Sequence, residues 1–376
     1  MKSWVLIAGD FTPLGGMDRA NYALASALAS GGEGDIDLVA HRVWPDLERA
    51  GAVRVHQVRR PFGSHLLGAP LLASAGERHA RRRGRSAAVV ANGGNADAGD
   101  VVWVHYLHAA HEPSAHGLRQ SLQVPAAHRY YLARERRALT RARLIVCNSR
   151  RTASDIADRY RIDASRLRVV YYGSDAREFA PVAHADRAAA RRALGWPAER
   201  PIVLFVGALA DRRKGFDRLF EAWRRLARDR SWDAELAVAG HGSELAAWRR
   251  RAEAAGLAGR IRFLGFRRDV AAVLAASDVL VHPARYEAYG LGVHEAICRG
   301  LPAIVSARAG VAETYPADLR DLLIDDVEDP DEIAGRLQTW RRDMPGAAAR
   351  VRALSARLGG RSWRDMSAEF VQAVTS

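Results

Sequence analysis

Two glutamates, Glu287 and Glu295, flank a glycine-rich turn in the stretch RYEAYGLGVHEAICRGLP of residues 285–302. Gly290 and Gly292 remove side chains at the expected start of a helix, so free N–H groups and the positive end of the helix dipole can face an anion. Carboxylates are repelled by phosphate but accept hydrogen bonds from sugar hydroxyls. The stretch is therefore either a clamp for a ligand with hydroxyl-rich ends and a charged middle, such as a nucleoside-diphosphate sugar, or an ordinary exposed loop that runs into an amphipathic helix.

A run of cations follows an expected strand in the stretch FVGALADRRKGFDRL. Arg212, Arg213 and Lys214 stand on the loop between this strand and the next helix. Cations in such a place can neutralise a leaving diphosphate, which is the main electrostatic requirement of glycosyl transfer without a metal. The alternative is a solvated run of charge.

Two further glycine turns follow expected strands. Gly15 and Gly16 precede a helix, where the backbone can approach phosphate or sugar oxygens. Gly240 and Gly242 form a lone Gly-x-Gly, which a tight turn explains as well as dinucleotide binding does.

Three histidines, His105, His108 and His111, crowd the end of another expected strand. They lack the carboxylate or cysteine partners of a metal site, and a single strand histidine is usually a satisfied core residue. The Asp-x-Asp at residues 35–37 begins an expected strand, so we interpret it as structural. We therefore expect no metal and no cofactor.

Strand-like and helix-like segments alternate along the whole chain. Short Val, Ile and Leu runs without clean alternation indicate strands buried on both faces of a parallel sheet. A polar Ala/Arg-rich segment interrupts the pattern, which then restarts. We predict an α/β protein with two Rossmann-like, doubly wound domains, residues 1–182 and 183–358, whose ligands bind at the carboxyl ends of the strands. A last helix in residues 359–376 is expected to cross back to the N-terminal domain.

The glutamate pair resembles the E-x7-E signature of retaining glycosyltransferases with the two-domain GT-B fold, the glycogen-synthase-like and mannosyltransferase-like group. The resemblance covers nearly the whole chain, and Gly-Leu-Pro follows the pair as in that family. It implies that Glu287 contacts the donor sugar and Glu295 the ribose. Ala288 stands where glycine is usual and His294 where an apolar residue is usual, so the sugar pocket differs in detail.

Other parts of the chain resemble the same family. Lys214 and the glycine after it match a family Lys-Gly pair, but Ala208 stands where the family has an arginine, so Arg212 or Arg213 is left to supply that charge. The stretch RVVYYGSD is similar to the family's turn at the domain junction, with Tyr172 in place of asparagine.

The resemblance also implies roles for single residues. It places His105 against the donor sugar near the anomeric centre and Arg267 near the base, and closes the Gly15-Gly16 loop over the donor phosphate and the acceptor. The predicted catalytic residues are His105, Glu287 and Lys214. The predicted donor-binding residues are Gly15, Gly16, Arg212, Arg213, Lys214, Gly240, Arg267, Glu287, Ala288, Tyr289, Gly290, Leu291 and Glu295.

The predicted function is retaining transfer of a hexosyl unit from a nucleoside-diphosphate sugar to a hydroxyl acceptor, a glycan or glycolipid of the cell envelope. The resemblance implies front-face displacement, in which the leaving diphosphate takes the proton of the nucleophile. Two rival functions stay open, a nucleotide-sugar epimerase on the same fold and a non-catalytic protein that binds polyanions. The base, the sugar, the acceptor and the oligomeric state are not predicted.

The composition of the 376 residues, 48% hydrophobic and 27% charged, is typical of a globular protein with ample core. No apolar run reaches the roughly 18 to 20 residues that span a bilayer. The apolar run at the N-terminus ends at Gly9, which favours a first strand over a signal peptide. Cys147 and Cys298 are too few for a disulfide framework or a zinc site, and we expect buried thiols in a reducing cytoplasm.

The net charge of +14 reflects an arginine excess, for which a GC-rich coding bias is one cause and attraction to polyanions another. The densest basic cluster follows the apolar segment HLLGAPLLASAG, which would suit a helix lying on the anionic inner face of a membrane. The alternative is a solvated helix. No nucleic-acid-binding module is recognisable. The cluster consists of Arg78, Arg81, Arg82, Arg83 and Arg85.

Overall fold

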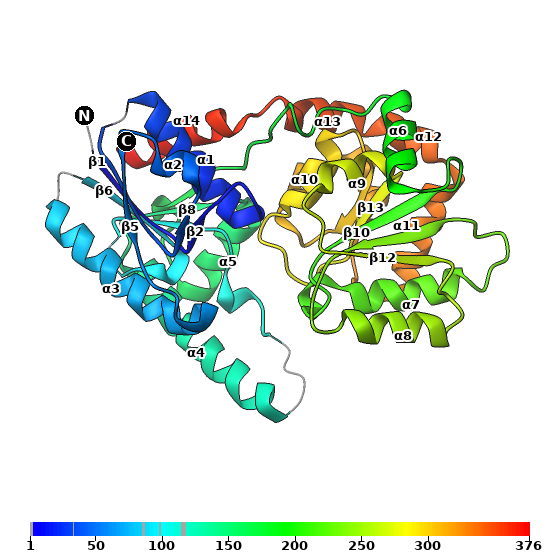
Figure 1. Cartoon of the computed structure of the whole chain (residues 1–376), viewed down its shortest axis with the longest axis horizontal. Helices are drawn as coiled ribbons and strands as arrows, with labels where there is room; N and C mark the ends of the chain where they lie inside the picture. Colours follow the sequence, from blue (N-terminus) through cyan, green and yellow to red (C-terminus); the bar gives the residue numbers. More distant parts are fainter. Residues whose placement is uncertain (1–2, 33, 85–86, 98, 114–117) are drawn as a thin grey trace. The chain divides into compact units, whose positions relative to one another are not determined.

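The computed structural model describes residues 3–32, 34–84, 87–97, 99–113 and 118–376 (Figure 1). The chain divides into two compact units, which we call the N-terminal unit, Met1–Gly173 with Ser362–Ser376, and the C-terminal unit, Ser174–Arg361. Each has its own parallel sheet and its own covering helices. The chain is thus an α/β protein with two Rossmann-like domains, as the sequence predicts.

The N-terminal unit is built on a seven-stranded sheet with the order β5-β3-β1-β6-β7-β8-β9, in which every pairing is parallel. The strands β1, β3, β6, β7 and β8 are buried almost throughout, because helices cover the sheet. The strands are β1 (Ser3–Ile7), β3 (Ile36–Ala40), β5 (Val53–Gln57), β6 (Ala87–Asn92), β7 (Val101–Val104), β8 (Leu144–Cys147) and β9 (Leu167–Val169). A short parallel pair, β2 (Asp10–Phe11) and β4 (Arg42–Val43), stands apart. The helices are α1 (Gly16–Gly31), α2 (Pro45–Glu48), α3 (His65–Arg83), α4 (Leu118–Arg141), α5 (Arg150–Tyr160) and α14 (Trp363–Thr375).

The C-terminal unit repeats this plan with six strands in the order β12-β11-β10-β13-β14-β15, again all parallel. Helix α7 packs against α11, and α6 packs against α9 (Figure 1). The strands are β10 (Ile202–Val206), β11 (Glu235–Ala239), β12 (Ile261–Gly265), β13 (Val279–His282), β14 (Ala303–Ser306) and β15 (Leu323–Ile324). The helices are α6 (His184–Leu194), α7 (Phe216–Leu226), α8 (Leu245–Ala254), α9 (Val270–Ala276), α10 (Leu291–Cys298), α11 (Pro330–Arg342), α12 (Met344–Arg350) and α13 (Arg352–Gly359).

The strand order of each sheet reverses beside one central strand. In the C-terminal unit the chain runs outward from β10 through β11 to β12, then returns to place β13 on the other side of β10. Ligands of open α/β sheets bind at the carboxyl ends of the strands beside such a switch point. The loops after β10 and β13 carry the cations and the first glutamate that the sequence singles out.

The unit boundaries differ by a few residues from those expected. The chain leaves the N-terminal unit after Gly173, not after residue 182, because the intervening segment packs on the C-terminal unit: Val182 donates its N–H to the carbonyl of Arg299 at 3.2 Å. It returns at Ser362, inside the expected region. Gly173 lies against that point, since an added Cβ would meet the Ser362 carbonyl carbon at 2.3 Å.

Smaller expectations concern the termini, the cysteines and the Asp-x-Asp. Residues from Ser3 onward form the first strand, and Cys147 and Cys298 are both buried. Asp37 is buried within β3, where its carboxylate pairs with Arg83 at 2.6 Å. Within the described ranges, no helix is long and apolar enough to cross a bilayer.

Candidate functional site

The loops after β10 and β13 pack directly on each other in the C-terminal unit. A 3-10 turn, η6 (Arg212–Lys214), ends at Gly215, which has φ +75°. A Cβ on Gly215 would lie 1.9 Å from the carbonyl oxygen of Pro283, so only glycine allows this approach. The N–H of Arg285 donates to the carbonyl of Arg213 at 2.8 Å. The cationic turn is thereby fixed beside the segment that carries Glu287.

Lys214 and Glu287 form an ion pair across this junction. The Lys214 Nζ donates to the Glu287 Oε2 at 2.5 Å, and the two side chains are only 18% and 14% exposed. His282, the last residue of β13, lies 3.1 Å from the same oxygen through its Nε2. A carboxylate can only accept, so His282 carries its proton on Nε2 and donates it. His282 is not among the predicted site residues.

The charges around Glu287 keep it ionised despite its burial. Burial by itself would raise the pKa of the Glu287 carboxyl, but the Lys214 ammonium, the His282 hydrogen bond and the Arg213 guanidinium together hold that pKa well below its ordinary value of 4.5. Burial lowers the pKa of His282, so its ring stays neutral at pH 7. The centre of the site is a stable carboxylate with a protonated amine on it.

The cationic turn contributes Arg213, not Arg212, to this centre. Arg213 Nη1 lies 3.9 Å from the Glu287 Oε2 and donates to the Tyr286 carbonyl at 3.3 Å, and its other nitrogens hold Asp211. The Arg212 side chain is exposed. Of the two arginines that could stand in for the charge missing at Ala208, the structure therefore brings Arg213 into the cluster.

Helix α10 begins next to Glu287. Its cap is Gly290 with φ +106°, and the Cγ of Glu287 would be 3.4 Å from a Cβ at that position. The N–H groups of Leu291 and Gly292, the first two of the helix, have no acceptor in the described part of the chain. A Cβ on Gly292 would meet nothing within 4 Å. This helix start thus has free donors with open space beside it, next to the Lys214–Glu287 pair.

The remainder of the E-x7-E segment is buried. Glu295 is 8% exposed on α10, and Ala288 and Tyr289 are each 2% exposed. The Tyr289 hydroxyl bonds to the Nδ1 of His294 at 2.8 Å, so these two residues pack together in the core. His294, which is unusual at this position, therefore stabilises the segment between Glu287 and Glu295 by its bond to Tyr289. The helix ends at Cys298 and is capped by Arg299, and Gly300 follows with φ +76°, in agreement with the expected Gly-Leu-Pro stop.

Gly240 and Arg267 lie in the loops that follow β11 and β12. A Cβ on Gly240 would lie 1.9 Å from the carbonyl oxygen of Gly207, so this glycine permits two strand ends to meet. Arg267 pairs with Asp269, its Nε donating at 2.8 Å, beside the exposed Phe266. Both residues are at the carboxyl edge of the same sheet, and their donor-binding roles stay predictions.

His105 lies in the N-terminal unit in a closed polar network. It is 7% exposed, accepts at Nδ1 from the Tyr172 hydroxyl at 2.5 Å and donates from Nε2 to the Asn21 amide oxygen at 3.2 Å. Burial lowers its pKa to about 3, so the ring is neutral. Because both ring nitrogens are engaged, the predicted contact with the donor sugar requires a change of partner. Tyr172, noted as a departure from the family turn, is thus one of the partners of His105.

The glycine turn at Gly15 caps helix α1, with φ +85° at Gly15. Asp18 follows in the first turn of the helix, and burial together with the nearby Asp10 raises its pKa to about 6. Arg42 holds Asp10 at 2.8 Å. The loop is therefore a charged rim at the carboxyl end of β1, and its contact with a donor stays a prediction. Over the described ranges, no three His, Cys, Asp or Glu side chains lie close enough together to hold a metal ion.

A feature of the composition could have marked Lys214 more sharply. The chain contains 57 basic Lys and Arg residues, yet only two of them, Lys2 and Lys214, are lysines. Because lysine is so rare in this chain, a lysine on a loop that follows a strand is a residue to test for a role that arginine does not share. His282 has no comparable signal, since its partner is defined only once the loop folds back.

Two family models match the chain, one for each half. The Glycosyltransferase Family 4 model matches residues 14–178, and the Glycosyl transferases group 1 model matches residues 186–353. The second match contains Lys214, His282, Glu287 and Glu295. Only short segments at the ends and at the junction lie outside the two matches.

Curated relatives have a higher sequence identity to this chain than the solved structures do, but over a smaller part of it. A 2-deoxystreptamine N-acetyl-D-glucosaminyltransferase of Streptomyces fradiae is 35% identical over 52% of this chain and 47% of its own length. A D-inositol 3-phosphate glycosyltransferase of Corynebacterium jeikeium is 28% identical over 64% of this chain and 58% of its own. The chain thus spans about half to three fifths of the length of these relatives.

Several solved structures have the same fold. WaaG, a glycosyltransferase involved in lipopolysaccharide biosynthesis, superposes with a TM-score of 0.75 over 100% of both chains at 21% identity. Sucrose-phosphate synthase from Thermosynechococcus elongatus gives 0.77 over 99% of this chain and 98% of its own, at 22% identity. Anabaena HepE in complex with UDP gives 0.70 over 100% of both chains, at 18% identity. These likenesses identify the two-domain architecture.

Proposed function

We propose that this chain, which belongs to the GT-B glycosyltransferases, transfers a hexosyl unit from a nucleoside-diphosphate sugar to a hydroxyl acceptor with retention. Each of its halves matches a glycosyltransferase family model. The observation that carries the proposal is the Lys214–Glu287 ion pair beside the open N-terminus of α10. Cationic side chains and free N–H groups lie close together there, and these are the groups that bind a diphosphate.

In this proposal the ion pair is the resting state of the donor site. A diphosphate at the start of α10 would attract the Lys214 ammonium away from Glu287, since it offers more negative charge to the same cation. Glu287, still held by His282, would then accept hydrogen bonds from sugar hydroxyls. Arg213 lies close enough to follow Lys214, because it contacts the same carboxylate oxygen at 3.9 Å.

Charge development in the transition state fits the same residues. As the bond from the sugar to the diphosphate breaks, negative charge grows on the leaving oxygen, and Lys214, Arg213 and the α10 N–H groups would stabilise it. Retention follows if the acceptor attacks on the face that the diphosphate leaves, with that group taking the proton of the nucleophile. We assign no general base among the residues of the C-terminal unit, and none is needed for this route.

The acceptor is proposed to be a hydroxyl compound of the cell envelope or a related polyol. The curated relatives are named for 2-deoxystreptamine and D-inositol 3-phosphate, both hydroxyl-rich six-membered rings, and WaaG for lipopolysaccharide biosynthesis. The three compound classes can be offered side by side. An epimerase, one of the two rival functions, would convert the donor sugar with no acceptor present, and a non-catalytic polyanion-binding protein would not turn the donor over.

A panel of nucleoside diphosphates is expected to stabilise the protein. A ligand at one hundred times its Kd adds about 2.7 kcal/mol of folding stability, which raises the melting temperature of a domain of this size by about 5–10 °C. The matched nucleoside monophosphates should stabilise it far less, because they lack the second phosphate that Lys214 and α10 would bind. Equal shifts for both ligand sets, or none for either, would contradict the donor site.

A face of α3 suits the proposed membrane contact. Small residues turn toward the sheet, where a Cβ on Gly76 would meet the Ile7 side chain at 2.8 Å, while Leu67 and Leu71 are 50% and 44% exposed. Phe62, in the turn before the helix, is 99% exposed. Arg78, Arg81 and Arg82 are exposed farther along the same helix, and apolar side chains beside cations suit an anionic bilayer surface.

Two residues of the predicted basic cluster do not join this face. Arg83 is turned inward, where its Nη2 pairs with the buried Asp37 at 2.6 Å, because this ion pair neutralises a carboxylate within the sheet. Arg85 is outside the described residues. The membrane face that we propose therefore consists of Phe62, Leu66, Leu67, Leu71, Arg78, Arg81 and Arg82.

Removing the three arginines of this face is expected to weaken binding to anionic vesicles by about 100-fold. Each cation near such a surface is worth about 1 kcal/mol. The triple variant Arg78→Gln/Arg81→Gln/Arg82→Gln is measured by sedimentation with phosphatidylcholine vesicles that contain or lack phosphatidylglycerol. The charge-matched control changes three exposed arginines of the C-terminal unit, in the variant Arg228→Gln/Arg249→Gln/Arg250→Gln. If both variants lose binding equally, net charge and not this face is responsible.

A further inference from the structure

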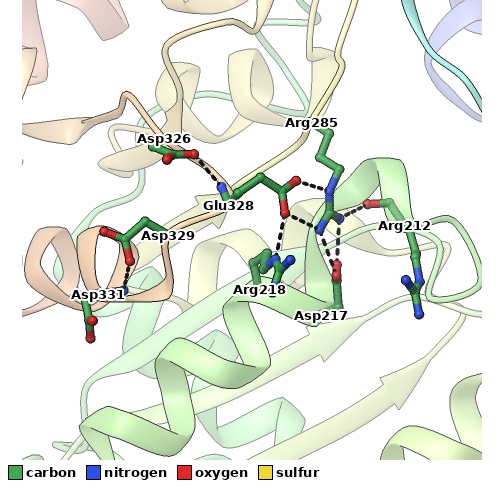
Figure 2. A network of polar contacts seen from close by, with 8 residues as sticks. All are labelled: Arg212, Asp217, Arg218, Arg285, Asp326, Glu328, Asp329 and Asp331. Carbon is green, nitrogen blue, oxygen red and sulfur yellow. Dashed lines mark hydrogen bonds and ion pairs between the residues drawn. The ribbon is translucent and has the colours of Figure 1, made fainter.

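Arg285 uses all of its side-chain donors within the C-terminal unit (Figure 2). Its Nη1 and Nη2 donate to the two oxygens of Asp217, each at 2.8 Å. Its Nε and Nη2 donate to the two oxygens of Glu328, the latter at 3.1 Å, and Nη1 also donates to the main-chain carbonyl of Arg212. A guanidinium has five N–H groups in a planar fork, and each of them has an acceptor here.

These contacts join three segments that are distant in sequence. Asp217 lies in the first turn of α7, directly after the cationic turn, and Glu328 lies before α11. Arg285 itself stands two residues before Glu287, and its main-chain N–H also binds the carbonyl of Arg213. Arg218 reinforces the network by donating to Glu328 at 2.8 Å. The network thus ties the segment that carries Glu287 to the cationic turn that carries Lys214.

The electrostatics of the network strengthen this junction. Burial would raise the pKa of Asp217, but its hydrogen bonds from Arg285 hold that pKa below its usual value, and the Arg285 bonds also lower the pKa of Glu328. Both carboxylates are therefore charged, and Arg285 is 20% exposed between them. Two bidentate pairs on one planar group fix direction as well as distance, which a single ion pair does not.

We infer that Arg285 is a positioning residue, which sets the distance between Lys214 and Glu287 through its contacts with Asp217, Glu328 and the Arg212 carbonyl. All five of its side-chain N–H groups have acceptors within the protein, so none is left for the proposed diphosphate or sugar. The Arg212 guanidinium points away from the network in Figure 2, so Arg285 holds the cationic turn through the main-chain carbonyl of Arg212. The Lys214 side chain takes no part in this contact. An effect of Arg285 on catalysis rests on the proposed function. Its effect on the distance between Lys214 and Glu287 does not.

Arg285→Lys is the sharpest substitution for a test. Lysine keeps the charge but has three donors on one atom, so it cannot span both carboxylates and the Arg212 carbonyl. We expect Lys214 to become more reactive, because a loosened turn releases its amine from Glu287. Competitive acetylation read by mass spectrometry measures this with little interference, as Lys2 is the one other lysine and supplies the reference rate. Labelling of Lys214 should rise at least about fivefold, which corresponds to about 1 kcal/mol of weakened pairing.

The matched control is Arg341→Lys in the same unit. Arg341 also holds a carboxylate with two bonds, to Asp233 at 2.8 and 2.6 Å, but far from the cationic turn in sequence. It should leave Lys214 labelling unchanged. Equal labelling in wild type and Arg285→Lys overturns the inference, and so does an equal rise in the control.

A second measurement separates this inference from the proposed function. Calorimetry uses the nucleoside diphosphate of the panel that raises the melting temperature of the wild type most. Its affinity should fall in Arg285→Lys and stay at the wild-type value in Arg341→Lys. If the wild type binds no nucleoside diphosphate although Lys214 labelling rises as expected, the positioning role holds and the donor site is wrong. If the wild type binds and Arg285→Lys binds equally well with unchanged labelling, the positioning role is wrong and the donor site stands.

Discussion

Replacing Lys214 with alanine is expected to lower turnover by about 10²- to 10³-fold, the usual cost of losing one group that stabilises developing negative charge. Lys214 is the nearest cation to Glu287 and, in the proposed site, the one that moves to the diphosphate. The protein should stay folded, because Glu287 keeps His282 and Arg213 as partners.

The same substitution should change the pH dependence in a definite direction. Burial raises the pKa of Glu287, and Lys214 is the largest of the influences that oppose it. Without Lys214 the folded-state pKa of Glu287 therefore rises, so the acidic limb of the turnover profile moves to higher pH. Lys214→Arg keeps the charge and should restore most of that limb while recovering turnover only in part, because a planar fork does not occupy the position of an ammonium.

Initial rates across pH, with a melting curve for each variant, test both effects. Arg228→Ala, which removes one exposed cation from the same unit, is the control for net charge and should match the wild type. Turnover within threefold of wild type in Lys214→Ala, with the profile unmoved, would remove Lys214 from the site.

Local features of the C-terminal unit could be predicted from the sequence. The strand before Glu287, the helix start at Gly290 and the helix end just before Gly300 each follow from residues within a few positions. These are an apolar run, a glycine with positive φ and a Gly-Leu-Pro. The placement of both charged loops at one edge of the sheet follows from the alternation of strands and helices, since crossovers bring the carboxyl ends of parallel strands together.

Contacts between distant segments could not be predicted in the same way. Lys214 and Glu287 are 73 residues apart, and no local pattern distinguishes Arg213 from its neighbour Arg212 as the arginine that turns inward. Which arginine turns inward depends on how η6 packs on Pro283. Gly215 permits this packing, but a glycine at this position does not predict it. For the same reason the sequence does not distinguish Arg83 from the exposed arginines beside it, because its partner Asp37 is 46 residues away.

The contribution of the Lys214–Glu287 ion pair to folding stability should be largest when measured by removing the charge of Glu287. Glu287→Gln is expected to destabilise the C-terminal unit by about 3 kcal/mol, because it leaves a poorly exposed ammonium without its counter-charge. A carboxyl with a depressed pKa contributes stability above its unfolded value of about 4.5, and this contribution is lost as the pH falls through the lower folded value. The stability deficit of Glu287→Gln should therefore be full at pH 7 and shrink in acid.

The double variant Lys214→Met/Glu287→Gln isolates the pair itself. It should be more stable than the sum of the two single effects predicts, with a coupling of about 1–3 kcal/mol from denaturant unfolding. Arg341→Met with Asp233→Asn, an exposed pair of the same unit, should give a coupling below about 1 kcal/mol. Additive effects at Lys214 and Glu287 would show that the two residues do not depend on each other.

Binding and turnover should then separate in Glu287→Gln. The neutral side chain no longer competes with a diphosphate for Lys214 and no longer repels it, so a nucleoside diphosphate should bind at least as tightly as to the wild type. Turnover should fall by about 10²-fold or more, because the group that orients the sugar has lost its charge. Calorimetry and initial rates on the same preparation measure the two quantities. Weaker nucleotide binding together with unchanged turnover would reverse the roles given to Glu287, and the resting ion pair would then be only a structural contact between the loops after β10 and β13.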